Sequence, residues 1–487
     1  MFWTFGMDLR TENERLRKEN QRLAEELAAT QEALRQVSDR LREVEAQLGQ
    51  DSHNSHWPSS RDKGKRQTKS LRKASGKKAG GQPGHAGATL TLQPEADSVV
   101  AHVPETCRGC GSALEGCAAT GQTPERRQVF DLPPLTLQVT EHRVAQVKCP
   151  QCGVLNVGDF PAGVTQATQY GPEVKGLCVY LNQHQLLPLQ RLAEVMNELF
   201  GCQLAPGSIV NWQREAATRV APAVTSIKEA LSQASILHCD ETGLYVEGKR
   251  YWLHLNATEQ LTYYFPHRKR GRAGIEDMGV LPAFTGVAVH DNWAAYGYYT
   301  CQHALCNVHH LRELTYIAEE FQQAWAADMR DFLVTSKAAV ATARTAGATA
   351  LTPAQREELA AAYQRITDDA FAANPVPPQG WPRRNAHGRP KKPKARNLAE
   401  RFDQQRTKIL AFLDDFNVPF DNNLAERDLR MLKVQQKVSG CFRSWDGAEH
   451  AAAIRSYLST MRKQGHNPLH LLRELFAGRL LAPSLSG

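Results

Sequence analysis

A heptad repeat runs from residue 9 to residue 48 of this 487-residue chain. Its a positions carry two asparagines followed by four leucines: Asn13, Asn20, Leu27, Leu34, Leu41 and Leu48. Its d positions are apolar with one exception: Leu9, Leu16, Leu23, Thr30, Val37 and Val44. Neither proline nor glycine interrupts the segment. Because apolar residues that recur about every 3.5 positions wind helices into a left-handed supercoil, residues 1–48 are predicted to form a coiled coil.

The two asparagines at a positions favour a parallel dimer in one register, because each can bond to its counterpart across the axis. The sequence therefore predicts a homodimer, or a higher oligomer, formed through this helix. The alternative is a single amphipathic helix that packs on its own protein.

The rest of the chain is long enough for roughly two to four folded units. Hydrophobic residues make up 41% of the sequence and charged residues 23%, which excludes a wholly disordered protein. No stretch approaches the roughly 18–20 consecutive apolar residues that a membrane span needs. The first ten residues lack a basic segment and a cleavage site, so we expect a cytoplasmic protein without a membrane partner.

The formal charge of +8 is concentrated in two basic clusters. Nine lysines and arginines lie within residues 61–78 beside one acid, and seven lie within residues 383–396 with no acid. Such clusters indicate a polyanionic partner, most often nucleic acid, although a solvated linker has the same composition. Residues 50–88 are rich in Ser, Lys, Gly and Pro, and they are predicted to form a flexible basic arm.

Four of the eleven cysteines form two Cys-x-x-Cys pairs: Cys107, Cys110, Cys149 and Cys152. Two such turns can present four thiolates to one Zn²⁺ in tetrahedral geometry. Residues 127–132 and 135–147 between them alternate like strands, so the sequence predicts a zinc ribbon over residues 100–160. Redox-active cysteine pairs are the alternative.

The pattern changes to helical between residues 170 and 220. Five apolar residues share one helix face: Leu189, Leu192, Val195, Met196 and Leu199. Gly201 and Cys202 interrupt this helix, and Pro206 begins another that contains Trp212. This arrangement predicts a helix-turn-helix, which is either a DNA reader or an ordinary helical hairpin.

From Ser235 the period changes to two, and four strands are predicted over residues 236–240, 251–256, 261–265 and 284–290. Residues 316–370 are helical in pattern, and helical patterning resumes at about Leu398. Strands followed by helices indicate a mixed α/β core that carries a helical insertion.

Three carboxylates have the right setting for chemistry. Asp240 and Asp291 are each predicted to end a buried strand, and Glu426 is predicted near the start of a helix. Two strand-end aspartates side by side, completed by a helical glutamate, would make a hard oxygen site for Mg²⁺ or Mn²⁺. Two such ions can activate an attacking oxygen and stabilise a leaving one. Taken singly, the aspartates could be turn residues and Glu426 part of a capping box.

The blocks Asp240-Glu241-Thr242, Asp291 to Tyr296 and Asp421 to Arg427 resemble the three motifs of insertion-sequence-66 family transposases. The zipper, the Gly-Gly-Gln-Pro-Gly-His arm, the paired Cys-x-x-Cys turns and the segment after Gly447 follow that family's order. The resemblance implies a ribonuclease H-like core with a catalytic triad of Asp240, Asp291 and Glu426. It also implies a bacterial protein that acts on the terminal inverted repeats of its own element, with accessory element proteins.

Pattern and resemblance together predict a multidomain chain. Its parts are a coiled coil (1–48), a basic arm (49–99), a zinc ribbon (100–160), a helix-turn-helix region (161–222), the first part of the core (223–315), a helical insertion with a basic loop (316–397), the second part of the core (398–440) and a C-terminal helical region (441–487).

The function predicted is DNA cleavage followed by attack of the 3′-hydroxyl on target DNA. A non-cutting DNA-binding regulator and a metal nuclease without strand transfer are the alternatives. Arg430 and Lys433 share a helix face with Glu426 and are predicted to hold DNA phosphates. A cluster of cysteines and histidines follows the second aspartate: Cys301, His303, Cys306, His309 and His310. These residues either bind a metal or, as we expect, belong to a strand and a helix beside the active site.

Overall fold

The computed structural model describes residues 5–50, 54, 84, 90–117, 126–133, 135–378, 380–381, 390 and 392–485. The chain divides into two compact units. The first comprises Met1–Lys69, Pro161–Glu194 and Leu204–Gly487, and the second comprises Ser70–Phe160 and Val195–Gln203. The arm that contains the first basic cluster and the Gly-Gly-Gln-Pro-Gly-His segment lies almost wholly outside the described residues.

The heptad segment forms one long helix, α1 (Phe5–Leu48), as predicted. Its leucines and valines at a and d positions from Leu16 onward are exposed, between 39% for Val44 and 77% for Leu48. Ala46, at an f position on the other side of the helix, is buried in the core of the first unit. Within the described part of the chain, this a and d face from Leu16 onward is therefore left unpacked.

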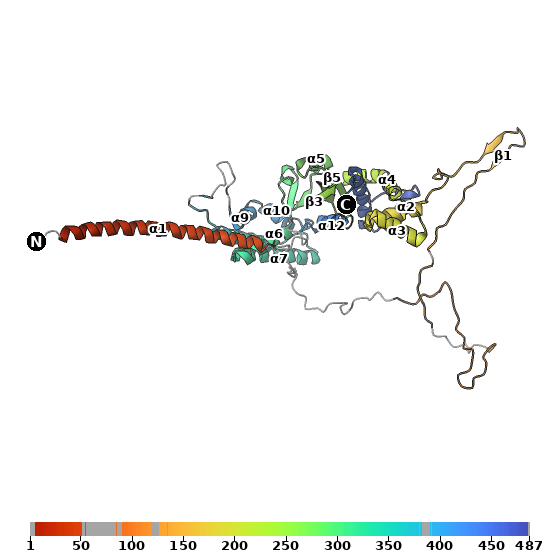
Figure 1. Ribbon diagram of the computed structural model, residues 1–487, viewed down its shortest axis with the longest axis horizontal. Helices are drawn as coiled ribbons and strands as arrows, with labels where there is room; N and C mark the ends of the chain where they lie inside the picture. The colour runs from red at the N-terminus through yellow and green to blue at the C-terminus, as the bar shows by residue number, and fades with distance from the viewer. Residues whose placement is uncertain are drawn as a thin grey trace. The chain divides into compact units, whose positions relative to one another are not determined.

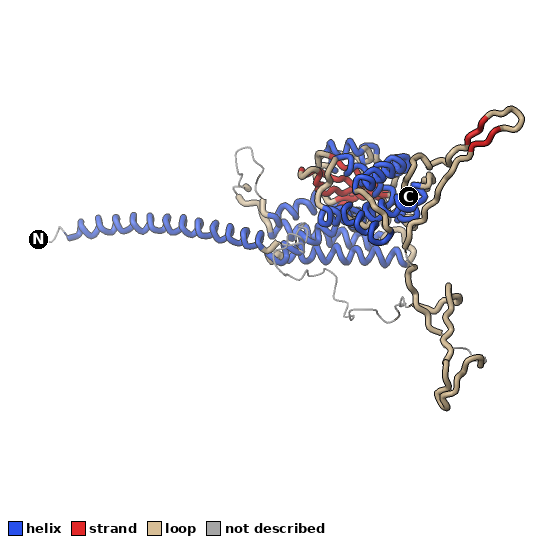
Figure 2. Tube along the Cα trace, turned by 45° about the vertical axis from the view of Figure 1, so that its right-hand side comes forward, coloured by secondary structure: helices blue, strands red, loops and turns tan. Residues whose placement is uncertain are grey.

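The second unit contains one regular hairpin, formed by β1 (Gln146–Lys148) and β2 (Leu155–Val157) and visible as the small pair of strands in Figure 2. Strands were predicted over residues 127–132 and 135–147, and only Gln146 and Val147 at the end of the second segment lie in a strand, β1. The other described residues of the two segments belong to no sheet. Their apolar side chains remain exposed, as at Val129 and Val139. Alternating sequence alone does not make a strand without a partner to share its hydrogen bonds.

The core of the first unit is a five-stranded sheet in the order β5-β4-β3-β6-β7. Its strands are β3 (Ile236–Val246), β4 (Lys249–Ala257), β5 (Thr262–His267), β6 (Val287–His290) and β7 (Gln302–Leu305). β3, β4 and β5 form an antiparallel meander, whereas β6 and β7 run parallel to β3. All four predicted strands are present, and β7 is the strand expected beside the active site.

Both faces of this sheet are covered, and Figure 1 shows β3 and β5 between α5 and α12. Leu237 and Cys239 of β3 pack with residues of α5 (Arg272–Met278). Leu244 and Val246 point the other way and pack against α12 (Asn423–Ser439). Because side chains alternate along a strand, Asp240 lies on the α12 face and Glu241 on the α5 face.

Two helices of the first unit, α4 (Pro206–Ser232) and α13 (Trp445–Lys463), contact β5 of the sheet. The helices α2 (Pro172–Val179) and α14 (Pro468–Phe476) pack on α4. The helix α3 (Leu189–Phe200) is divided between the two units. Both helices of the predicted helix-turn-helix exist, and the first ends at Gly201, whose φ of 67° is left-handed. α4 continues without a break past residue 222, where the helix-turn-helix region was expected to end.

A helical insertion between β7 and α12 has a hydrophobic core of its own. Its helices are α6 (Asn307–Glu320), α7 (Ala324–Thr345), α8 (Pro353–Ala373), α9 (Lys394–Gln404), α10 (Arg406–Ile409) and α11 (Ala411–Asp414). Much of the second basic cluster lies outside the described residues. Within it, Lys392 and Arg396 both pair with Glu400, so these two cations are neutralised inside the protein.

None of the helices in the described ranges is long and apolar enough to cross a membrane.

Candidate active site

Asp240 and Asp291 lie next to each other at one edge of the core. β3 and β6 are parallel neighbours in which His238 pairs with Val289, so Asp240 and Asp291 each follow that pair by two residues. Asp291 comes directly after β6, as predicted. Asp240 does not end a strand, and that prediction is wrong: β3 continues to Val246 because its second half pairs with β4.

The electrostatics of this pair favour a bound cation. Burial raises the pKa of Asp240 well above its usual value, and the negative charges of Glu241 and Asp291 raise it further. The Lys433 ammonium opposes this shift, although it does not outweigh it. Carboxylates that destabilise one another in a partly buried site are stabilised by a hard divalent ion, for which they are the preferred ligands.

The loop after β6 holds Asp291 in a defined turn. Its carboxylate oxygen Oδ1 accepts a hydrogen bond from the backbone N–H of Trp293 at 3.1 Å. Asn292 between them has a φ of 66°, the left-handed region that asparagine tolerates better than most residues. Asp291 therefore does stabilise a turn after its strand, as considered above. This hydrogen bond uses Oδ1, so Oδ2 can still contact a metal ion.

Glu426 lies in the first turn of α12, which packs on the same sheet face as Asp240. Ala425, Leu429 and Leu432 bury the inner side of the helix against β3 and β4. The residue before the helix is Asn422, whose side chain makes no capping bond to the helix. The capping box considered for Glu426 is thus absent.

The side chain of Asn422 instead fastens the start of α12 to the sheet. Its Nδ2 donates to the backbone oxygen of Cys239 at 2.8 Å, and its Oδ1 lies 2.8 Å from His238 Nδ1. Its backbone N–H donates to the sulfur of Cys306 at 3.2 Å. Asn422 is only 2% exposed, so these bonds form in a low-dielectric interior. They fix the helix start one residue away from Asp240 along β3.

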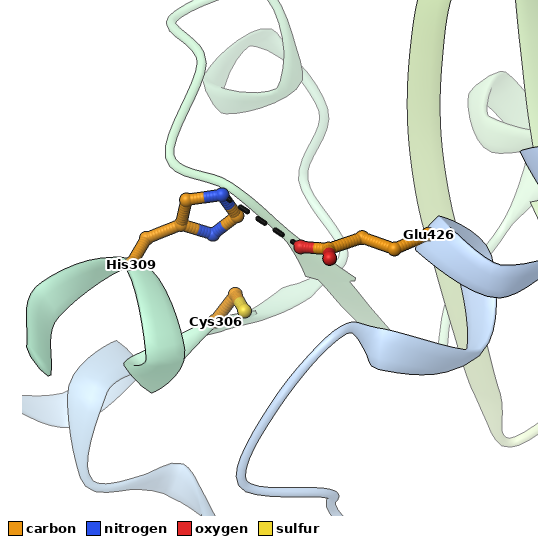
Figure 3. A group of neighbouring side chains, drawn as sticks. All are labelled: Cys306, His309 and Glu426. Carbon is orange, nitrogen blue, oxygen red and sulfur yellow. Dashed lines mark ion pairs between the residues drawn. The ribbon is translucent and has the colours of Figure 1, made fainter. Parts of the chain in front are cut away.

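Figure 3 shows Glu426 facing His309 and Cys306, and Glu426 Oε1 lies 3.7 Å from His309 Nε2. Among the described residues, these three form the one group of His, Cys, Asp or Glu whose ligand atoms all lie within 4.8 Å. The carboxylates of Asp240, Asp291 and Glu426 do not converge that closely. Burial raises the pKa of Cys306 to about 12, so its sulfur is a thiol that accepts a hydrogen bond rather than a thiolate.

The remaining members of the cluster, Cys301, His303 and His310, contact other groups of the strand and helix beside the site. Cys301 Sγ lies 4.0 Å from His303 Nε2. Asn292 N–H donates to His290 Nδ1, so His290 Nε2 carries the proton shared with His303 Nδ1 at 3.0 Å. His303 Nε2 in turn lies 3.0 Å from the Tyr299 oxygen. His310 bonds to Asn307 on α6.

A network that the sequence did not reveal lies on the other face of β3. The Glu241 side chain is 2% exposed and accepts hydrogen bonds from Arg270 and from the Tyr296 hydroxyl, the latter at 2.6 Å. The Arg270 guanidinium lies between the rings of Trp252 and Trp293, at 4.8 and 4.3 Å. The only sequence signal for this network is the basic run of residues 268–270 after β5. The run does not indicate which arginine is directed into the protein.

Arg430 and Lys433 are both exposed on α12. No ion pair joins Arg430 to Glu426 in the described part of the chain, so the structure contains no helix pair to occupy this arginine.

The two cysteine pairs of the second unit have the same local geometry. In each, the backbone N–H of the first cysteine donates to the residue five positions on, at 2.8 Å, and a left-handed glycine donates back at 2.9 Å. These glycines are Gly111 and Gly153. The four sulfur atoms are not gathered into one group.

Hydrogen bonds favour the thiolate form in both turns. A bond from the Ser112 side chain lowers the pKa of Cys110 to about 7, and backbone N–H groups of Cys152 and Gln151 lower the pKa of Cys149. Thiolates are the form that binds zinc, so each turn is preformed for a metal.

Fold and site define a multidomain protein. It has a helical N-terminus, two turns that each carry a pair of cysteines, and a mixed α/β core that bears the carboxylates. The profile of the Transposase IS66 family matches residues 167–450, which is more than half of the chain. The chain therefore belongs to the IS66 family of transposases. The zinc-finger binding domain of transposase IS66 matches residues 104–153, and a family of unknown function matches residues 8–91. No curated protein gives a significant match.

Replacing Asn422 should weaken the core without touching the carboxylates. In Asn422→Ala, His238 and the Cys239 carbonyl lose buried partners, and we expect a loss of about 2–3 kcal/mol in the free energy of unfolding. The measurement is the urea midpoint followed by tryptophan fluorescence. Asn423→Ala, one residue on and exposed, is the control and should change stability by less than about 0.5 kcal/mol. Equal shifts for both variants would contradict the role of Asn422.

Proposed function

We propose that this transposase cuts DNA at the terminal inverted repeats of its element and joins the ends to target DNA in a metal-dependent reaction. The observation that carries the proposal is the register of β3 and β6, which sets Asp240 beside Asp291 on the sheet face that α12 covers. Family membership supplies the class of substrate, DNA.

We further propose that the core is ribonuclease H-like. An antiparallel meander extended on one side by two parallel strands supports this, as does the helical insertion that precedes α12. In this reading Asp240 and Asp291 come from neighbouring strands and Glu426 from a helix across the sheet. The same three positions follow from the motif resemblance.

In the proposed reaction Asp240, Asp291 and Glu426 hold Mg²⁺ or Mn²⁺. When bound, the metal activates the attacking oxygen and stabilises the leaving one. In the first step an oxygen of water bonds to phosphorus and the P–O3′ bond breaks, which releases the 3′-hydroxyl of the element. In the second step that hydroxyl bonds to a target phosphorus and a target 3′-hydroxyl leaves. The protein positions the carboxylates by the β3–β6 register and by the Asn422 bonds to β3.

Removing any one carboxylate tests this proposal. Asp240→Asn, Asp291→Asn and Glu426→Gln should each reduce cleavage of end-bearing DNA to background while binding persists, because phosphate contacts elsewhere supply most of the affinity. Glu247→Gln, an exposed glutamate at the β3–β4 turn, is the control and should cleave normally. A triad variant that cuts at the wild-type rate would remove that residue from the site. Cleavage without joining by the wild-type protein would identify a nuclease, and no cleavage a regulator.

Arg430 and Lys433 are proposed to hold phosphates beside the scissile bond. Lys433 already acts on the charge of Asp240, which places its ammonium near the site. An arginine can hold two phosphate oxygens at once.

An Arg430→Ala and Lys433→Ala double variant should cut poorly and should show a salt dependence of end binding that is weaker by about one to two units of slope. Arg427→Ala, a cation on the same helix that does not lie at the i+4 or i+7 position from Glu426, is the control. Normal cleavage with unchanged salt dependence in a folded double variant would refute the phosphate role.

The family match supports a structural zinc ion, and we propose that Cys107, Cys110, Cys149 and Cys152 hold it. The two turns with matching hydrogen bonds and lowered thiol pKa values support this set. Binding would bring the turns together and would stabilise a unit that buries few apolar side chains.

Metal analysis should find one zinc ion per chain in the wild-type protein and none in Cys110→Ser. The control is Cys117→Ser, an exposed cysteine seven residues further on that belongs to neither turn. Loss of zinc from the control, or its retention in Cys110→Ser, would exclude this ligand set.

We propose that α1 pairs with α1 of a second copy to form a parallel coiled coil. The exposed a and d residues support this, because burying these leucines and valines between two helices lowers the free energy. Each protomer of the dimer would then bind DNA through its own arm and helix-turn-helix region. Accessory element proteins would be further partners.

Sedimentation equilibrium tests the pairing. Leu27→Lys with Leu34→Lys places charges in the seam and should convert a dimer to a monomer. Gln21→Lys with Ala28→Lys adds the same charge at b positions and should leave the mass unchanged. A dimer that survives the seam variant would refute pairing through α1.

A further inference from the structure

The segment Arg268–Gly271 joins β5 to α5 and carries a basic run that neither long basic cluster includes. We call residues 268–271 the β5–α5 loop. It follows His267 directly and ends where α5 begins at Arg272.

The backbone of the β5–α5 loop is tightly fixed. Lys269 N–H donates to His267 Nδ1 at 3.2 Å, and His254 Nε2 lies 3.2 Å from the Lys269 oxygen. Gly274 allows this approach, because a Cβ there would lie 2.4 Å from His254 Nε2 and 2.7 Å from the Lys269 oxygen. A loop held in this way presents its outward side chains from a constant position.

Arg270 ties the loop to the aspartates. Its guanidinium donates to Glu241, the residue after Asp240, and lies over the ring of Trp293. The backbone N–H of Trp293 donates to Asp291 Oδ1. The loop is therefore linked to the segments of β3 and of the β6 loop that carry Asp240 and Asp291.

Arg268 and Lys269, the two residues before this anchor, are exposed. In the described part of the chain neither lies within ion-pair distance of a carboxylate. Arg272, by contrast, pairs with Glu276 at 2.6 Å. The Arg268 guanidinium lies 5.3 Å from the ring centre of Trp445, which supports the side chain while leaving its charge unneutralised.

We propose that Arg268 and Lys269 bind phosphates of the DNA strand beside the cleavage position. This site is separate from Arg430 and Lys433 on α12, and it rests on the proposed function. Two exposed cations that pair with no carboxylate in the described part of the chain favour a polyanion. The Glu241–Arg270–Trp293 contacts link their loop to the segments that carry Asp240 and Asp291. The contact is with phosphates, so it adds affinity and alignment but no sequence readout.

The test uses two double variants. The loop variant combines Arg268→Ala and Lys269→Ala. The control variant combines Arg356→Ala and Arg365→Ala on α8, which removes the same charge from an exposed face of the insertion. Two lost phosphate contacts should make the loop variant's affinity for end DNA about tenfold less sensitive to a change from 50 to 200 mM salt. Cleavage should fall, with unchanged Mg²⁺ dependence. The swap of Arg268→Lys with Lys269→Arg keeps both charges and should restore binding.

Lysine acetylation of the wild-type protein gives a readout that does not depend on cleavage. End DNA should protect Lys269 and leave Lys18, at an exposed f position of α1, reactive. DNA that binds while Lys269 stays fully reactive, with unchanged salt dependence in the loop variant, would overturn this site alone. Failure of the wild-type protein to bind or cut end DNA would overturn the proposed function itself.

Discussion

The buried side chain of Asn422 determines how the two halves of the core meet. The helical insertion separates β7 from α12 along the chain, and it has its own hydrophobic core. α12 therefore needs a specific contact to reach the sheet in one register. Apolar packing of Leu429 and Leu432 is nondirectional and tolerates sliding, whereas the bonds of Asn422 to His238, Cys239 and Cys306 do not. The position of Glu426 relative to Asp240 depends on them.

The elements of the core were predictable because their periodicity is strong. The four predicted strands are found where the pattern placed them, since buried faces require a regular spacing of apolar residues. The helices between β7 and α12 extend from Asn307 to Asp414, beyond the residues 316–397 predicted for the insertion. Asp240 was misplaced at a strand end because Glu241, Thr242 and Gly243 interrupt the apolar pattern. Pairing with β4 overrides this local polarity. In the zinc region the opposite error arose, because alternating residues lacked a partner strand.

The candidate site was only partly predictable. Asp240 and Asp291 were recognisable from their place after apolar runs, and the motif resemblance identified Glu426. Asn422 and Arg270 were not, since their roles depend on contacts with residues 183 and 29 positions away along the chain. The cluster of cysteines and histidines shows the same limit. Its members share a segment, yet the fold sends His303, Cys306 and His310 to different partners.

α4 passes without interruption from the helix-turn-helix region to the residue before the turn into β3. Twenty-seven residues of helix span about 40 Å. Pro222 lacks the N–H of an ordinary helical residue and is the one internal proline of this rod. A displacement of the helix start at Pro206 is therefore expected to move the helix end that precedes β3, the strand that bears Asp240. Bending of α4 is expected mainly at Pro222.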